Sequence, residues 1–182
     1  KVWSKGKQIQ VILFGFEIEF DAKEKNRLNP QALRLSEKAI AALREHDGAV
    51  AEDHIRQAIK IQPNEPSLLN NLAVSLNMQG KKSEAETIAD QIEKQYPDYF
   101  FGQMYSARKA ILFGYYNKAQ KILDGLINRK TLHITEFSAL CSCQIDLFLA
   151  TDKYQSAISW YDIWKKISPE DPALERYSDF ED

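Results

Sequence analysis

The chain has 182 residues, of which 44% are apolar and 27% charged, and its formal net charge is −2. A chain of this length normally forms one domain with a sufficient core, and the composition excludes disordered and fibrous proteins. Nucleic-acid-binding proteins usually carry a clear excess of Lys and Arg on one face, so the near balance of charge argues against RNA or DNA as the partner.

The cysteines and the hydropathy of the chain indicate its cellular environment. The two cysteines, Cys141 and Cys143, are too close in sequence to form the cross-links of small secreted proteins, so we expect a reducing, cytoplasmic environment. The longest apolar run, residues 11–16, is far shorter than the roughly 20 residues of a membrane span. We therefore expect no membrane span. The chain starts at Lys1 rather than at a methionine, which is compatible with a removed signal peptide or a preceding segment.

Residues 1–28 alternate in the manner of β-strands. The apolar residues fall in two phases, Ile9, Val11 and Leu13 and then Phe16, Ile18 and Phe20. The change of phase near Gly15 predicts a bulge or a bend, and residues 4–7 predict the turn of a short hairpin. Because a lone hairpin is marginal in water, residues 8–20 must pack on the first helices, pair with a second copy, or complete a sheet that the sequence does not contain.

Residues 29–182 carry an internal repeat. Similar local sequences surround four alanines at spacings of 34, 34 and 38, namely Ala51, Ala85, Ala119 and Ala157. A proline follows three of these alanines by twelve residues, at Pro63, Pro97 and Pro169, and the third repeat has Thr131 in that place. A fixed period of this size is typical of stacked helical units. We place the four extra residues of the longer interval near 130–133, in a linker between units.

Each unit is predicted to contain two antiparallel amphipathic helices, since apolar and small residues recur three and four apart on both sides of a short break. The first helix should begin at Asn29 as N-cap and Pro30 as first helical residue. The breaks are expected at Asp47-Gly48, Gly80, Gly114 and Asp152-Lys153. Ser83 and Glu86 form a capping-box pattern for the fourth helix. This gives eight helices in four pairs, ending at Ile167.

These residues resemble the tetratricopeptide repeat family, whose pattern of about 34 residues reads W-x2-L-G-x2-Y, then A-x3-F, then P. The resemblance spans 29–169 and is best in the second unit, at Leu69, Leu72, Ala73, Leu76, Gly80, Ala85, Ala89 and Pro97. Ala73 replaces the family glycine, Ile92 replaces its second small residue, and Lys38 occupies a leucine position.

The resemblance implies an all-α fold, a right-handed superhelical solenoid of about four helix pairs, preceded by the strand or hairpin segment 1–28. The solenoid would occupy 29–182, with repeats at about 32–65, 66–99, 100–133 and 138–171. The opening of another helix at residues 172–177 would then cap the end, unless further sequence or a partner does so.

The resemblance also implies a non-catalytic scaffold that binds a protein or an extended peptide in a concave groove lined by the first helix of each pair. The predicted contacts are Asn70, Asn71, Met78, Phe101, Met104, Tyr105 and Arg108, and Ser142 and Asp146 occupy matching positions of the fourth unit. Amides suit a peptide backbone, and Met and Phe give adaptable apolar contacts. Core packing is the alternative for Phe101 and Met104, and capping or solvation is the alternative for Asn71.

A dense aromatic stretch marks the third unit as the anchoring region for a partner, although core packing explains part of it. The stretch comprises Tyr96, Tyr99, Phe100, Phe101, Tyr105, Phe113, Tyr115 and Tyr116. Two further functions remain open. The strand at residues 8–20 suits a self-assembly module, and the chain suits an accessory domain of a larger enzyme or complex.

No catalytic, cofactor or metal site is predicted. Cys141 and Cys143 lie two apart on a predicted helix, so their side chains diverge by about 200° and are expected to be buried or half-buried structural thiols. The three histidines, His46, His54 and His133, lack the spacing of a helical metal pair. The sequence contains neither a nucleophile elbow nor a glycine-rich phosphate loop. We therefore expect the chain not to be an enzyme.

Overall fold

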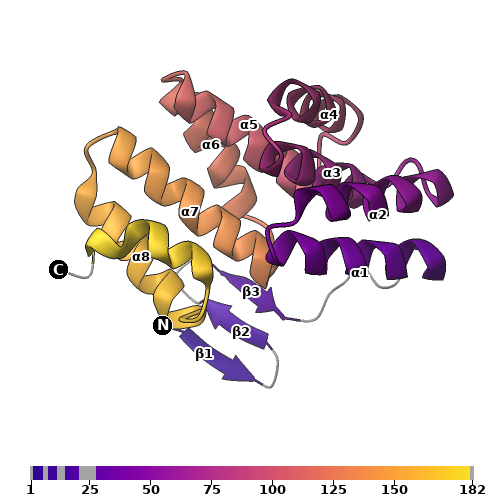
Figure 1. The fold of residues 1–182 in the computed structure, drawn as a ribbon. Coiled ribbons are helices and arrows are strands. Elements are labelled where there is room, and N and C mark those ends of the chain that lie inside the picture. Colours follow the sequence, from indigo (N-terminus) through magenta and orange to yellow (C-terminus); the bar gives the residue numbers. More distant parts are fainter. Residues whose placement is uncertain (1, 6–7, 12–14, 21–27, 181–182) are drawn as a thin grey trace. The chain divides into compact units, whose positions relative to one another are not determined.

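The computed structural model describes residues 2–5, 8–11, 15–20 and 28–180, and its first three strands precede a series of helices (Figure 1). The chain divides into two units. The N-terminal helical unit comprises Lys23–Gln103, and the strand-bearing unit comprises Lys1–Ala22 together with Met104–Asp182. The division falls inside one helix, between Gln103 and Met104.

Eight α-helices lie in the described part of the chain, in agreement with the prediction. They are α1 (Pro30–Arg44), α2 (Gly48–Ile61), α3 (Pro66–Met78), α4 (Lys82–Gln95), α5 (Phe100–Leu112), α6 (Tyr116–Ile127), α7 (Ile134–Ala150) and α8 (Tyr154–Ile167), followed by the 3-10 helix η2 (Pro172–Phe180). Helix α1 packs on α2, α3 on α4, and α7 on α8. The described helices thus form tetratricopeptide-like hairpins. None of these helices has both the length and the apolar character that a membrane crossing requires.

The first helix of every hairpin ends in the same way. One residue adopts the left-handed conformation, with φ between 57° and 75°, and these residues are His46, Gly80, Gly114 and Asp152. The N–H of the next residue donates to the carbonyl five positions back, as from Asp47 to Ala42 at 2.9 Å and from Tyr115 to Ala110 at 2.8 Å. The four left-handed residues keep the spacings of 34, 34 and 38, so the expected breaks are confirmed.

Small residues allow close helix contacts within the N-terminal helical unit. Ala51 and Ala85 are buried, and they share one core cluster with Leu72 and Leu76. A Cβ atom on Gly48 would stand 2.9 Å from the carbonyl oxygen of Ser75, a separation that real Cβ atoms essentially never show. The beginning of α2 therefore lies close against α3, and the repeated alanines are confirmed as architectural.

Glu52 ties α2 to the turn between α3 and α4. Its carboxylate accepts from Lys81 Nζ and from Gln79 Nε2, each at 2.8 Å, and pairs with Arg56 at 2.7 Å. Gln79 Nε2 also donates to the carbonyl of Gly48 at 3.0 Å. The hydrogen bond from Lys81, together with that from Gln79, lowers the pKa of Glu52 to about 2. This charged network fixes how the first two hairpins meet.

The N-terminal strands form part of a four-stranded sheet in the order β1 (Val2–Lys5), β2 (Gln8–Val11), β3 (Phe16–Glu19) and β4 (Thr131–His133). Strands β1 and β2 pair antiparallel, which confirms the expected hairpin; of its predicted turn, residues 6–7 lie outside the described ranges. Val11 pairs with Phe16 in a second hairpin. The change of phase near Gly15 therefore separates two paired strands, so the predicted bulge is wrong, and the alternative, a bend, agrees with the reversal of the chain between Val11 and Phe16. Residues 12–14 of the connection between these strands are also outside the described ranges.

Strand β3 pairs in parallel with β4, a strand that the sequence did not predict. Ile18 stands opposite Leu132, and the N–H of Glu17 donates to the carbonyl of Lys130 at 2.9 Å. Ile18 and Leu132 are completely buried, and the ring of Phe16 lies 6.0 Å from that of Phe137 on α7. The N-terminal segment thus completes a sheet that the chain itself supplies, within the strand-bearing unit.

Strand β4 also explains the irregular third repeat. Its residues occupy the linker in which four extra residues were expected, and it begins at Thr131, where the other repeats carry proline. Proline has no N–H to donate to a sheet, whereas the β-branched threonine found here suits the start of a strand. The missing proline and the four extra residues of the longer interval thus both fall at β4.

Helix starts were predicted less well than helix ends. Asn29 is confirmed as the N-cap of α1, because its side chain accepts from the N–H of Gln31 at 2.9 Å. The predicted capping box at Ser83 is wrong. Helix α4 begins at Lys82, without a side-chain cap, since the turn at Gly80 starts the helix before Ser83 is reached.

Replacing His46 by glycine should stabilise the N-terminal helical unit. A residue with a side chain costs about 1–2 kcal/mol in the left-handed region, and glycine loses roughly 0.5–1 kcal/mol of this gain through the entropy of the unfolded chain. We expect His46→Gly to raise the free energy of unfolding by about 0.5–1 kcal/mol in urea denaturation. Glu45→Gly, at a negative φ in the same turn, should lower it. A loss of stability in His46→Gly would contradict the assignment of this turn.

Truncation of Ile18 should destabilise the strand-bearing unit. Its side chain is fully buried, on a strand that pairs with β4 and packs on α7, so Ile18→Ala should cost about 2–5 kcal/mol in chemical denaturation. The matched variant is Phe20→Ala, because Phe20 follows the same strand but is 38% exposed. Its cost should be about 1 kcal/mol or less. Equal losses in the two variants would mean that β3 is not part of the core.

Candidate functional site

The residues predicted to contact a peptide fall into both units. Asn70, Asn71 and Met78 lie on α3, and Phe101 lies in the first turn of α5, all within the N-terminal helical unit. Met104, Tyr105 and Arg108 lie on the remainder of α5, in the strand-bearing unit. We therefore treat them as two separate sets.

The α3 set presents two unused amides. Asn70 and Asn71 are half-buried, and neither side chain has a hydrogen-bond partner among the residues that the structure describes. Leu69 and Leu72, on either side of them, are buried. Further along the helix, Met78 is 39% exposed. Polar groups in half-buried positions usually find partners, so these amides are available to a ligand or to water.

Phe101 and Met104 take part in packing. The half-buried Phe101 ring lies 5.2 Å from the ring of Phe100 in an edge-to-face arrangement and 5.9 Å from the ring of Tyr99. Met104 is only 3% exposed. Its side chain belongs to the interior of the strand-bearing unit, so the surface contact predicted for Met104 is replaced by a core role. Phe101 retains an exposed portion.

Arg108 joins a polar cluster with the fourth hairpin. Its guanidinium donates to Ser142 Oγ at 2.9 Å. Next to this contact, the hydroxyl of Tyr177 donates to Asp146 Oδ1 at 2.9 Å and to the carbonyl of Ser142 at 3.0 Å. Arg176 pairs with the same Asp146 oxygen at 3.0 Å. The structure thus brings Arg108, Ser142 and Asp146 together.

The C-terminal segment covers the last hairpin. In η2, Leu174 and Tyr177 are buried, and the Tyr177 ring lies 6.1 Å from that of Trp164 on α8. Asp171 accepts from Trp164 Nε1 at 3.1 Å and from the hydroxyl of Ser138. Burial, followed by the charge of Asp146, raises the pKa of Tyr177. The stub expected from the sequence is therefore a packed 3-10 helix that bridges α7 and α8.

Neither cysteine has the properties of a reactive thiol. Cys141 and Cys143 are free and buried, as predicted. Burial raises the pKa of Cys141 well above its ordinary value and that of Cys143 to about 11, so both remain protonated near neutral pH. Within the described ranges, no three His, Cys, Asp or Glu side chains gather as a metal site would require.

Sequence reasoning missed His133, which supports the strand-bearing unit at the start of α7. The N–H of Thr135 donates to His133 Nδ1 at 3.3 Å, and the N–H of His133 donates to Glu136 Oε2 at 2.9 Å. This is a capping box with histidine in the place of serine or threonine. The glutamate three residues after His133 was the signal present in the sequence.

No protein-family model matches the chain, and no curated protein matches it either. Solved structures similar to it include the MamA RS-1 ArsTM double mutant, with 15% sequence identity and a TM-score of 0.46 over 85% of this chain and 87% of that chain. Another is a tetratricopeptide repeat protein from Parabacteroides merdae, with 18% identity and a TM-score of 0.43 over 84% of this chain and 73% of that chain.

Proposed function

We propose that the chain is a non-catalytic scaffold that holds a protein or an extended peptide against the first helices of its hairpins, in the cytoplasm. The observation that carries this proposal is the pair of adjacent amides on α3, Asn70 and Asn71, which are half-buried and have no partner in the described part of the chain. An amide both donates and accepts, as the peptide backbone does.

The surroundings of the two amides suit a peptide. Val74 and Met78 lie three to four and seven to eight residues further along α3, so they continue the same strip of the helix. Both are exposed, Val74 by 41% and Met78 by 39%. We call Asn70, Asn71, Val74 and Met78 the α3 strip. It offers hydrogen bonds at one end and apolar contact at the other, which is what an extended segment with apolar side chains needs.

The α5 set adds charge in the strand-bearing unit. Arg108 is exposed while its guanidinium is held by Ser142, so it can meet an acidic group without losing much freedom. Lys109 lies 5.5 Å from the centre of the Tyr105 ring. These cations favour partners that carry carboxylates.

Self-assembly is a second candidate function, supported by the sheet. Strand β1 is the outermost strand on its side, with β2 as its neighbour. Edge strands recruit further strands, either from a second copy or from another protein. This function could accompany peptide binding, because it uses a different part of the chain.

The α3 strip is tested by affinity capture of the native partner, followed by calorimetry with the purified partner. Asn71→Ala should weaken binding by ~1–3 kcal/mol, because the group that it bonds is left unpaired in a desolvated site. Phe101→Ala should cost about as much if its exposed portion anchors the partner. The control is Asn64→Ala, an exposed asparagine in the turn before α3.

Thermal melting separates binding from packing. Asn71→Ala should melt close to the wild-type temperature, whereas a phenylalanine that acts only as a core residue would cost ~3–5 kcal/mol of stability on truncation. Normal melting combined with full retention of the partner in both variants would contradict the proposal.

A further inference from the structure

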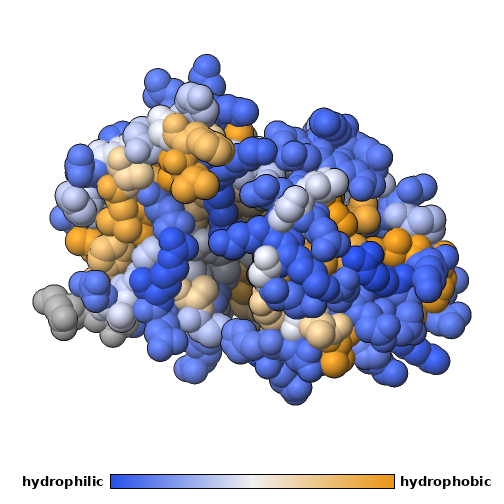
Figure 2. Space-filling view, turned by 45° about the horizontal axis from the view of Figure 1, so that its top comes forward, coloured by the Kyte–Doolittle hydropathy of each residue, from blue (hydrophilic) through white to orange (hydrophobic). Residues whose placement is uncertain are grey.

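The turn between α5 and α6 exposes a run of large apolar side chains. The exposed fractions are 81% for Leu112, 62% for Phe113, 65% for Tyr115 and 37% for Tyr116. We call these four residues the aromatic turn. In the space-filling view, hydrophobic side chains reach the surface at the upper left, where this turn lies (Figure 2). Contiguous apolar surface of this kind marks an interaction site more often than it occurs by chance.

The fold does not require apolar residues in this turn. All four hairpins close with a left-handed residue and the same hydrogen bond, so their turns can be compared position by position. The places of Leu112 and Phe113 are held elsewhere by Arg44-Glu45, Met78-Gln79 and Ala150-Thr151. The place of Tyr115 is held by Asp47, Lys81 and Lys153. The places of Phe113 and Tyr115 are thus held by polar residues in all three other turns, so the turn itself does not explain why these two side chains are aromatic.

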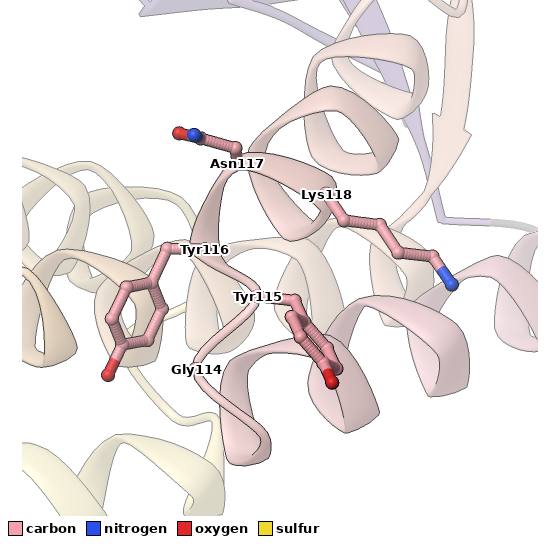
Figure 3. A pocket seen from close by; sticks show the side chains of 5 residues that line it. All are labelled: Gly114, Tyr115, Tyr116, Asn117 and Lys118. Carbon is pink, nitrogen blue, oxygen red and sulfur yellow. The ribbon is translucent and has the colours of Figure 1, made fainter.

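The aromatic turn encloses an open hollow. The rings of Tyr115 and Tyr116 diverge on either side of Gly114, and Lys118 extends along one rim (Figure 3). The open hollow lined by residues 114–118 has a volume of about 520 Å³. Apart from its two chain neighbours, no residue comes within 4 Å of the point where a Cβ of Gly114 would stand, so the space beside Gly114 is open. A hollow between two rings accepts an inserted side chain.

The two helices that form the turn carry an excess of positive charge close to it. Between Asp98 and Asp124 the sequence holds no acidic residue, and its four cations are Arg108, Lys109, Lys118 and Lys121. All four are exposed. They lie on α5 and α6, the two helices that form the turn. A ligand carrying carboxylates would meet a positive field here.

We propose that the aromatic turn is a docking surface for an acidic polypeptide segment that carries aromatic or large aliphatic side chains. One such side chain enters the hollow between Tyr115 and Tyr116, and flanking carboxylates face Lys118 and Lys121. The hollow favours a peptide over a bilayer, because a membrane surface has no side chain to fill it. This surface does not involve the α3 strip, so the proposal stands apart from the function proposed above.

The test begins with phage-displayed random peptides selected on the immobilised full chain. We expect the selected peptides to combine Asp or Glu with Phe, Trp or Leu. A fluorescent copy of the strongest peptide should then bind at least tenfold more weakly to the double variant Leu112→Ser, Phe113→Ser. Lys118→Glu with Lys121→Glu should give a similar loss, and added salt should weaken wild-type binding.

Three controls define the result. Val50→Ser, which removes a 45% exposed valine from α2, should bind the peptide as the wild type does. Asn71→Ala should also leave peptide binding unchanged, which separates this site from the α3 strip. The serine variants should melt at the wild-type temperature because they replace exposed residues. If the serine variants melt at a lower temperature, the peptide affinity of the Lys118→Glu, Lys121→Glu variant tests the proposal instead.

Several outcomes would overturn the proposal. Selection of basic peptides, or of no common pattern, would contradict the predicted chemistry. Peptide binding that survives both sets of variants would contradict the predicted location. Co-sedimentation with phosphatidylcholine vesicles containing phosphatidylserine, lost in the Phe113→Ser variant and without selection of acidic peptides, would assign the turn to a membrane surface instead.

Discussion

The parallel pairing of β3 with β4 is the constraint on which the strand-bearing unit depends. It joins residues 17–19 to residues 131–133, so a long loop must close before the contact forms. The burial of Ile18 and Leu132 offsets that entropy. Because α7 begins at Ile134, directly after β4, the sheet also positions the helix that carries Ser142 and Asp146.

The elements predicted from the sequence are those set by local rules. The spacing of apolar residues predicted the eight helices. Glycine at two left-handed positions, Gly80 and Gly114, predicted where the helices of a pair are separated. Strand β4 has only three residues, which is too short for any periodicity to show, and its partner lies far away in the sequence. The cap at Ser83 was misplaced because the preceding turn, and not the capping residue, sets the start of α4. The prediction from sequence therefore failed where a strand pairs with a distant segment, and where a turn and a capping residue indicate different starts for the same helix.

The same distinction applies to the candidate sites. The sequence indicated the aromatic stretch of the third unit, but not which rings face solvent. Phe100, Met104 and Ala107 follow helical spacing and are buried, whereas Leu112 and Phe113 end the helix outside that spacing and are exposed. Comparison of the four turns at matching positions would have isolated Phe113, whose place is held by polar residues in the other three. By contrast, the hydrogen-bond status of Asn70 and Asn71 depends on neighbours that only the folded chain supplies.

The central claim is that the N-terminal strands fold as part of the strand-bearing unit. Native-state amide hydrogen exchange measured against denaturant concentration tests it most directly, because segments that open together share one free energy and one denaturant dependence. We expect residues 16–19, 131–133 and 137–147 to share both the free energy of opening and its dependence on denaturant. Exchange of residues 16–19 at the rate of an unfolded chain, while 137–147 remain protected, would contradict it.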